Sequence, residues 1–180
     1  MQDTVQVGAL PIDLSKPWQV IKFGTADMFL PAMASIGPYK DLNLVGSYAD
    51  PDDQTARTAH RDKDLPWHRD GIESQAIKDM QGGNYITAPN VDVVGMYCIS
   101  DNRDPDSGNR IPCFTVLAEA APDADPYDES QFKIIAEVDL RPGDALIWDN
   151  RLWHRRHGPV GSRVLVRFWS TCPALHEVRP

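Results

Sequence analysis

Two histidines and an aspartate are the residues in this sequence whose types and spacing best suit catalytic chemistry. His68 and Asp70 stand two residues apart in the stretch LPWHRDG, and His154 ends the stretch GDALIWDNRLWH. Residues two apart on an extended strand point to the same side. If a later strand brings His154 to the same point, two imidazoles and one carboxylate can hold one side of a metal ion. That is the ligand set of non-haem Fe(II) oxygenases, which leave the opposite positions open.

The alternatives to this triad stay open at the level of sequence. An isolated His-x-Asp is more often a surface pair, and the tripeptide HRD occurs a second time at residues 60–62, within a polar stretch. His157 competes with His154 for the role of distal histidine. We favour His154, because His157 would leave only a short loop before Arg163.

Two arginines follow the distal histidine in a run that reads as a strand, residues 163–169. Alternation places Arg163 and Arg167 on one face with Leu165 and Trp169. Both faces of this run are largely apolar, which predicts a buried strand. A buried guanidinium is costly unless it meets an anion. The pattern therefore predicts either an anionic ligand or an internal carboxylate beside each arginine.

Taken together and in this order, these motifs resemble those of the Fe(II)/2-oxoglutarate-dependent dioxygenases, and most closely the taurine dioxygenase family. The resembling pieces begin at residues 65, 94, 143 and 161 and read LPWHRDG, VGMYCI, GDALIWDNRLWH and GSRVLVRFW. The resemblance thus covers residues 65–169. The sequence departs from the family at residues 107–109, SGN, where a glycine pair is frequent, and the distal histidine is slightly closer than usual to the first arginine.

The resemblance implies a metal and a co-substrate. His68, Asp70 and His154 would bind Fe(II) as the catalytic centre. 2-Oxoglutarate would chelate the iron and extend its far carboxylate to Arg163, since a two-pronged arginine–carboxylate contact supplies orientation as well as energy. Thr115 would add a hydrogen bond to that carboxylate.

The resemblance also implies a reaction, the hydroxylation of a small substrate with release of succinate and CO2. Arg167 would hold an anionic group of that substrate. Halogenating relatives replace the carboxylate ligand with a small residue, so Asp70 favours hydroxylation, desaturation or cyclisation. Two other classes remain open: a cupin-like metal enzyme that does not use 2-oxoglutarate, and a non-catalytic jelly-roll that acts as a binding module.

The expected fold is mainly β, a double-stranded β-helix (jelly-roll) with few short helices, as the resemblance implies. Fifteen prolines and twelve glycines scattered between short apolar runs suit many short strands. We predict strands at 5–14, 16–23, 42–48, 91–100, 111–117, 132–138, 145–148 and 163–169. A helix is predicted at 25–35, interrupted by Pro31. The run RPGD at 141–144 predicts a turn with Gly143 at positive φ.

Bulk properties narrow the class of protein. The 180 residues predict a single domain, 1–180, and 42% hydrophobic with 24% charged residues is typical of a globular protein. A net charge of −8 argues against nucleic acid as a partner and leaves a small-molecule substrate. No leader pattern and no apolar run of membrane-spanning length are present, so we expect a cytoplasmic protein that binds no membrane. Three cysteines without a CxxC pair suit a reducing compartment.

The remaining arginines and tryptophans have plainer expected roles. Three arginines around the distal histidine are expected to be exposed: Arg151, Arg155 and Arg156. Four tryptophans are expected to belong to the core rather than to a substrate platform: Trp67, Trp148, Trp153 and Trp169. Cys98 and Cys113 are expected to be buried.

Overall fold

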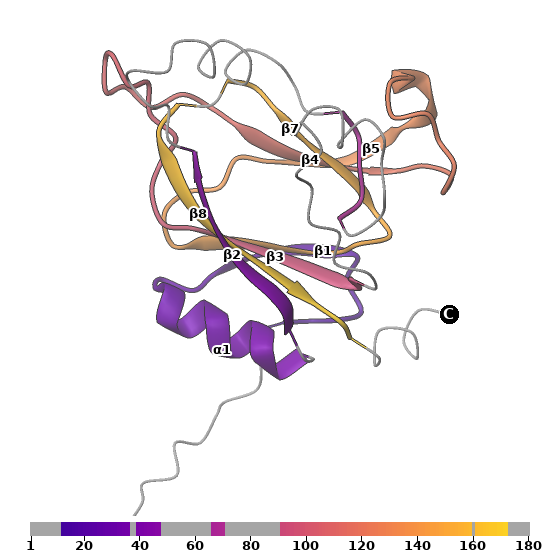
Figure 1. Cartoon of the computed structure of the whole chain (residues 1–180), viewed down its shortest axis with the longest axis horizontal. Coiled ribbons are helices and arrows are strands. Elements are labelled where there is room, and N and C mark those ends of the chain that lie inside the picture. Colours follow the sequence, from indigo (N-terminus) through magenta and orange to yellow (C-terminus); the bar gives the residue numbers. More distant parts are fainter. Residues whose placement is uncertain (1–11, 37–38, 48–65, 71–90, 160, 173–180) are drawn as a thin grey trace, which may run out of the picture.

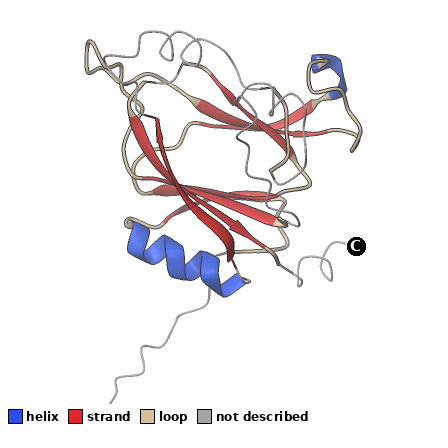
Figure 2. Cartoon of the chain, viewed as in Figure 1, coloured by secondary structure: helices blue, strands red, loops and turns tan. Residues whose placement is uncertain are grey.

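The computed structural model describes residues 12–36, 39–47, 66–70, 91–159 and 161–172, with the backbone alone for 39–47. The described residues are mainly β, with few helices, as the sequence predicts (Figure 2). The elements in chain order are β1 (Trp18–Lys22), α1 (Ala26–Ile36), β2 (Tyr39–Ser47), β3 (Val93–Cys98), β4 (Phe114–Glu119), the 3-10 helix η1 (Glu129–Gln131), β5 (Lys133–Val138), β6 (Asp144–Asp149), β7 (Trp153–His157) and β8 (Arg163–Ser170). None of the helices in this described part is long and apolar enough to cross a membrane.

The strands form two antiparallel sheets that face each other (Figure 1). The larger sheet has the order β1-β6-β3-β8-β2 and the smaller one the order β5-β4-β7. The chain passes repeatedly from one sheet to the other: β3 lies in the larger sheet, β4 and β5 in the smaller, β6 in the larger, β7 in the smaller and β8 in the larger. This alternation brings β7 and β8, which carry the distal histidine and the two arginines, onto opposite walls of one interior.

The apolar side chains pack in three layers. The first cluster joins α1 to the outer face of the larger sheet, the second fills the space between the sheets, and the third covers the outer face of the smaller sheet. Leu117, Leu146 and Leu165 meet in the second cluster, one from β4, one from β6 and one from β8. Around these three leucines the space between the sheets is therefore filled by packed apolar side chains.

Helix α1 runs through Pro31 without the predicted interruption. Pro31 is exposed, whereas Phe29 and Met33 on the opposite side are fully buried. Pro31 thus lies on the exposed side of the helix, and the packing of the buried side compensates for one missing helical hydrogen bond. The helix lies close to the sheet at Gly95, where an added Cβ would stand 2.6 Å from Met33 Cε.

Several predicted local features are confirmed. Gly143 has φ 90°, and the Asp144 N–H donates to the Arg141 carbonyl at 2.9 Å, which closes the predicted turn. On β8, Leu165 packs between the sheets and Phe168 packs toward α1, so the predicted alternation is correct.

In three places the local structure differs from what the sequence predicts or lies outside the described residues. Strand β7 was not predicted, because its sequence WHRRH lacks the apolar alternation that signals a strand. Residues 66–70 form an isolated bridge at His68 rather than a strand. Of the strand predicted at 5–14, residues 12–14 are not a strand and the rest lies outside the described part.

The entry to β8 depends on Gly161, which lies too close to a neighbouring backbone to carry a side chain. The Gly161 N–H donates to Asn102 Oδ1 at 2.8 Å, and an added Cβ would stand 1.9 Å from the Arg103 carbonyl oxygen. That carbonyl pairs with the Ser162 N–H at 2.7 Å. Gly161→Ala must therefore displace backbone and break this bridge, and we expect a loss of about 3 kcal/mol in the free energy of unfolding.

Denaturant unfolding measures this loss, with Gly108→Ala as the control. Gly108 has φ +71° and open space around its missing Cβ, so only backbone strain of about 1 kcal/mol applies. Equal losses from the two variants would contradict the close approach at Gly161.

Candidate metal centre

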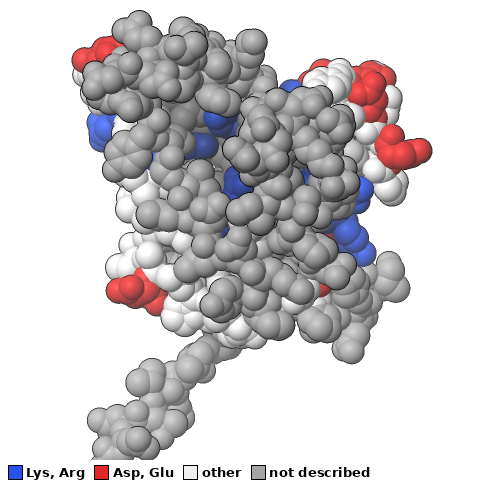
Figure 3. Space-filling view, viewed as in Figure 1, with Lys and Arg blue, Asp and Glu red and all other residues white. Residues whose placement is uncertain are grey.

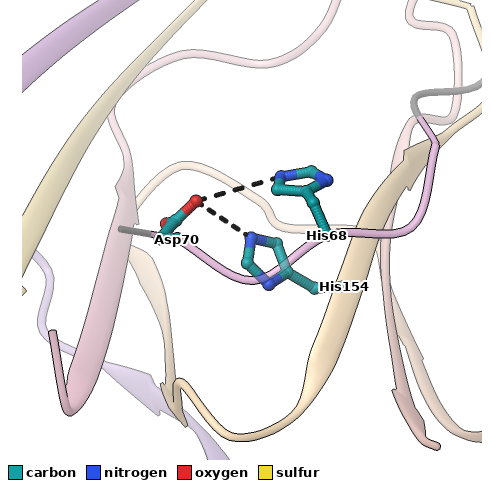
Figure 4. A group of neighbouring side chains, drawn as sticks. All are labelled: His68, Asp70 and His154. Carbon is teal, nitrogen blue, oxygen red and sulfur yellow. Dashed lines mark ion pairs between the residues drawn. The ribbon is translucent and has the colours of Figure 1, made fainter. Parts of the chain in front are cut away.

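His68, Asp70 and His154 come together in the structure, all three buried, with one ligand atom from each within 4.8 Å of the others. The Asp70 Oδ1 atom lies 3.3 Å from His154 Nε2 and 3.9 Å from His68 Nε2. Both imidazoles thus turn the same ring nitrogen toward one carboxylate oxygen (Figure 4). Nitrogen and oxygen atoms so arranged can hold a metal ion.

Backbone pairing brings the two histidines together across 86 positions of sequence. The His68 N–H donates to the His154 carbonyl at 3.0 Å, and the His154 N–H donates to the His68 carbonyl at 2.9 Å. The ring centroids are 4.3 Å apart. Strand β7 is an edge of the smaller sheet, so it has a free side on which this short segment can pair.

Asn150 holds the aspartate end of the segment. Its side-chain oxygen accepts from the Asp70 N–H at 3.0 Å, and its Nδ2 donates to the Asp70 carbonyl at 2.6 Å and to the Val91 carbonyl at 3.0 Å. Asn150 is itself buried. One side chain in the turn between β6 and β7 therefore fixes the backbone of a metal-ligand candidate.

Aromatic packing fixes the other end of this segment, at Trp67. Trp67 is fully buried, and its ring stacks on Phe132 with centroids 4.7 Å apart. The Trp67 Nε1–H donates to Glu129 Oε2 at 3.2 Å. Arg155, whose side chain is only 14% exposed, lies over Trp67 at 4.4 Å and pairs with Glu129. The predicted exposure of Arg155 was thus wrong, because a cation–π contact covers it, whereas Arg151 is exposed as expected.

The protonation state of His68 is the one that a metal-binding histidine needs. Its Nδ1 lies 2.8 Å from the Pro66 carbonyl oxygen, which can only accept, so Nδ1 carries the hydrogen. The lone pair is then on Nε2, the nitrogen that faces Asp70. Burial, and next the proximity of His154, lower the pKa of His68 to about 3. His68 is therefore a neutral imidazole, the form that binds metals.

Asp70 is a carboxylate in spite of its burial. Burial alone raises its pKa, but the electrostatic attraction of His154 and Arg167 outweighs burial, and the pKa of Asp70 lies below its usual range. Its second oxygen, Oδ2, accepts a hydrogen bond from Trp169 Nε1 at 2.7 Å. The two oxygens thus have different partners, since Oδ1 faces the histidines and Oδ2 faces an indole.

This arrangement suits a cation between the ligand atoms. The lone pair of His68 Nε2 faces a negatively charged oxygen, which is repulsive unless a positive charge lies between them. Both ring nitrogens of His154 are buried and lack a well-aligned hydrogen-bond partner among the described residues, although Nε2 lies 3.3 Å from Asp70 Oδ1. A divalent metal would satisfy His68, His154 and Asp70 at once, so the residues present fit such an ion.

The structure places the two arginines at different distances from this group. Arg167 acts electrostatically on both His68 and Asp70, and its guanidinium carbon lies 5.7 Å from the Trp169 ring centroid. Arg163 lies farther along β8, near Cys98, whose pKa is raised to about 11 by burial, an effect that Arg163 partly opposes. Within the described part of the chain, neither arginine forms a salt bridge, and the Nε of each is buried without a hydrogen bond.

Thr115 lies on the same face of the smaller sheet as the distal histidine. It is buried, and it stands two residues before Leu117, which pairs directly with His154 across β4 and β7. His157, the alternative distal histidine, is exposed at the end of β7. Of the two histidines, the structure brings His154 to the triad.

Sequence reasoning missed two residues that serve this site. Trp169 was assigned to the core and does pack, half-buried, against the cluster between the sheets, but its hydrogen bond to Asp70 across 99 positions was not predicted. Asn150 was noted as part of a motif without a role. The sequence held one useful signal, since Trp169 shares its strand face with both arginines. Trp67, Trp148 and Trp153 are buried as expected, as are Cys98 and Cys113.

Comparisons with known proteins identify no family for this chain. No family model matches the sequence, and no curated protein matches it. Among solved structures, the chain is similar to the crystal structure of AviO1 from Streptomyces viridochromogenes Tue57, at 18% sequence identity and a TM-score of 0.46, over 82% of this chain and 58% of that chain. The chain therefore spans about 58% of that protein's length. The residues of the site itself have to carry any assignment of function.

The geometry predicts the metal dependence of single variants. His68→Ala, Asp70→Ala and His154→Ala each remove one of three ligands, so each should weaken Fe(II) binding by more than the roughly 10- to 100-fold that changes outside the ligand set cost. Anaerobic calorimetry with Fe(II) measures this. In the unaltered protein, metal at 100 times its Kd should add about 2.7 kcal/mol to stability, visible as a higher Tm.

His157→Ala is the matched control, because it removes an exposed imidazole three residues from His154. It should leave Fe(II) affinity unchanged. Loss of binding in His157→Ala together with normal binding in His154→Ala would show that the distal ligand is the other histidine.

Proposed function

We propose that this protein is an Fe(II)- and 2-oxoglutarate-dependent oxygenase that hydroxylates a small anionic substrate and releases succinate and CO2. The observation that carries the proposal is the buried group of His68, Asp70 and His154, with one carboxylate oxygen facing two imidazole nitrogens. This is the ligand chemistry of non-haem iron oxygenases, in which three protein ligands leave the other side of the metal open.

The proposed fold is the double-stranded β-helix, or jelly-roll, that the resemblance to the taurine dioxygenase family implies. Its support is the repeated passage of the chain between two facing antiparallel sheets from β3 to β8. In such a fold the interior between the sheets is the natural place for a ligand. The candidate metal group lies at this interior, between β7 of one sheet and Trp169 on β8 of the other.

The proposed co-substrate site uses the farther arginine. Arg163 is six residues from Trp169 on the same strand face, about 20 Å along the strand at about 3.3 Å per residue. Because Trp169 contacts Asp70, Arg163 is the more distant of the two arginines from the metal group. The resemblance to the taurine dioxygenase family assigns it to the far carboxylate of 2-oxoglutarate, and because that diacid is much shorter than this separation, the Arg163 side chain would have to reach back along the strand toward the metal. Thr115, on the facing sheet, would add a hydrogen bond to the same carboxylate.

The proposed substrate site uses the nearer arginine. The charge of Arg167 acts on His68 and Asp70, so an anion bound by Arg167 lies close to the metal. Figure 3 shows Lys and Arg side chains near the middle of this face as well as at its edges, and Asp and Glu side chains mainly toward its edges. The basic groups near the middle are compatible with an anionic ligand there, in a chain of net charge −8.

When bound, the iron would activate O2 with electrons from the oxidative decarboxylation of 2-oxoglutarate and so supply the oxidant. The protein's own residues do the rest. His68, Asp70 and His154 would hold the metal on one side, Arg163 and Thr115 would orient the co-substrate, and Arg167 would orient the substrate. Orientation of this kind supplies much of the rate enhancement, because the reacting atoms meet in one geometry.

The role of Arg163 is testable through co-substrate affinity. Under anaerobic conditions with Fe(II), 2-oxoglutarate should produce the weak visible charge-transfer band of a chelated 2-oxo acid, and its titration gives Kd. Arg163→Ala should raise that Kd by about 30- to 1,000-fold, since a charge-assisted pair in a desolvated site contributes about 2–4 kcal/mol.

Arg141→Ala is the control for the loss of a positive charge, because Arg141 is 53% exposed at its side chain. It should leave the Kd unchanged. An unchanged Kd in Arg163→Ala would refute its role. A protein that binds Fe(II) but shows neither the band nor succinate release would point to a metal enzyme that does not use 2-oxoglutarate, and a protein that binds no metal would point to a non-catalytic binding module.

The role of Arg167 is testable with a panel of small carboxylates, sulfonates and phosphates, each assayed for stimulation of succinate release. In the unaltered protein, at least one anionic compound should stimulate release. Arg167→Gln should abolish or strongly weaken that stimulation, while the Kd of 2-oxoglutarate stays within about threefold of its original value. Stimulation by neutral compounds, equal in Arg167→Gln and the unaltered protein, would contradict an anionic substrate.

A further inference from the structure

Trp169 holds one of the two oxygens of a metal-ligand candidate. Its indole Nε1–H donates to Asp70 Oδ2 at 2.7 Å, while Oδ1 of the same carboxylate faces His68 and His154. An indole N–H can only donate, and a bond of this length to a carboxylate is a strong, charge-assisted one. A strong hydrogen bond therefore keeps Oδ2 of Asp70 on the indole while Oδ1 stays turned toward the two histidines.

We infer that Trp169 is a positioning residue that restricts Asp70 to coordination through Oδ1 alone. This inference rests on the proposed metal site and goes beyond it. A carboxylate that bound the metal through both oxygens would take up a further position and leave fewer for co-substrate and O2. With Oδ2 held by the indole, Asp70 occupies a single position, and the open side of the metal stays free for chemistry.

The surroundings of Trp169 hold the indole in place. Its ring packs against the cluster between the two sheets, and Val94 on β3 is its directly paired neighbour across the ladder. Arg167, two residues earlier on the same face, lies over the ring at 5.7 Å. The donor is thus carried by a central strand of the larger sheet rather than by a loop, which keeps its direction fixed.

Two substitutions separate the hydrogen bond from the bulk of the ring. Trp169→Phe keeps an aromatic ring and removes the N–H. Trp169→His loses the larger ring but keeps a ring nitrogen, Nε2, at the position that corresponds to the indole Nε1 when counted from the main chain. If only the packing of the ring supports metal binding, Trp169→Phe should keep more of the metal affinity than Trp169→His. If the hydrogen bond supports metal binding, Trp169→His should keep more of it than Trp169→Phe.

The experiment uses the full chain with Co(II) alone, and measures the dissociation constant and the visible absorption spectrum of the bound ion. Trp169→Phe should bind Co(II) about 10- to 100-fold more weakly, as is usual when an outer partner of a ligand is lost. Its spectrum should change, because Asp70 becomes free to use both oxygens. Trp169→His should recover most of the affinity and the original spectrum.

Trp18→Phe is the matched control, since Trp18 is likewise half-buried against the cluster between the sheets but lies on β1, at the edge of the larger sheet. Its Co(II) affinity should equal that of the unaltered protein. Original affinity and spectrum in Trp169→Phe would overturn the inference, as would a loss in Trp169→His as large as in Trp169→Phe. Should Trp169→Phe fail to fold, Trp169→His decides alone: the original affinity and spectrum would support the inference, and a loss of about 10-fold or more in Co(II) affinity would overturn it.

The outcome is independent of the oxygenase proposal. If the unaltered protein binds Co(II), the Trp169 variants behave as expected and 2-oxoglutarate yields no succinate, the inference stands and the proposed reaction fails. If the unaltered protein binds no Co(II), both fail together.

Discussion

A buried carboxylate is the constraint on which the rest of this site depends. Asp70 is 2% exposed and ionised, and an ionised group in such a place needs positive charge and hydrogen bonds around it. Trp169 supplies one hydrogen bond, and Arg167 supplies positive charge at a distance. The remaining oxygen faces two imidazole nitrogens, which is the arrangement a divalent cation completes.

The fold serves this constraint by joining distant parts of the chain at the edge strand β7. A reciprocal pair of backbone hydrogen bonds sets His68 beside His154, and Asn150 ties the Asp70 backbone to the turn that precedes β7. The same short segment is buttressed on its outer side by the stack of Trp67 on Phe132. Ligand candidates from two separated stretches are thus fixed by backbone contacts and packing, which is how a precise site is kept in a small protein.

Much of this could be predicted from sequence where the signal was local or periodic. Alternation along residues 163–169 gave the two faces of β8 correctly, and proline followed by glycine gave the turn at Gly143. The grouping of His68, Asp70 and His154 came from motif order. Strand β7 escaped prediction because its residues are polar or aromatic, and pairing with β4 rather than periodicity makes it a strand. The contacts of Trp169 and Asn150 also escaped, because each joins residues 80 or more positions apart.

Anomalous X-ray scattering from crystals grown anaerobically with Fe(II) would locate a metal ion bound between the three side chains. We expect a single strong peak at the iron absorption edge, within bonding distance of His68 Nε2, His154 Nε2 and Asp70 Oδ1, with Asp70 Oδ2 still on Trp169. A peak elsewhere, or fully loaded crystals in which these three side chains touch no metal, would contradict it.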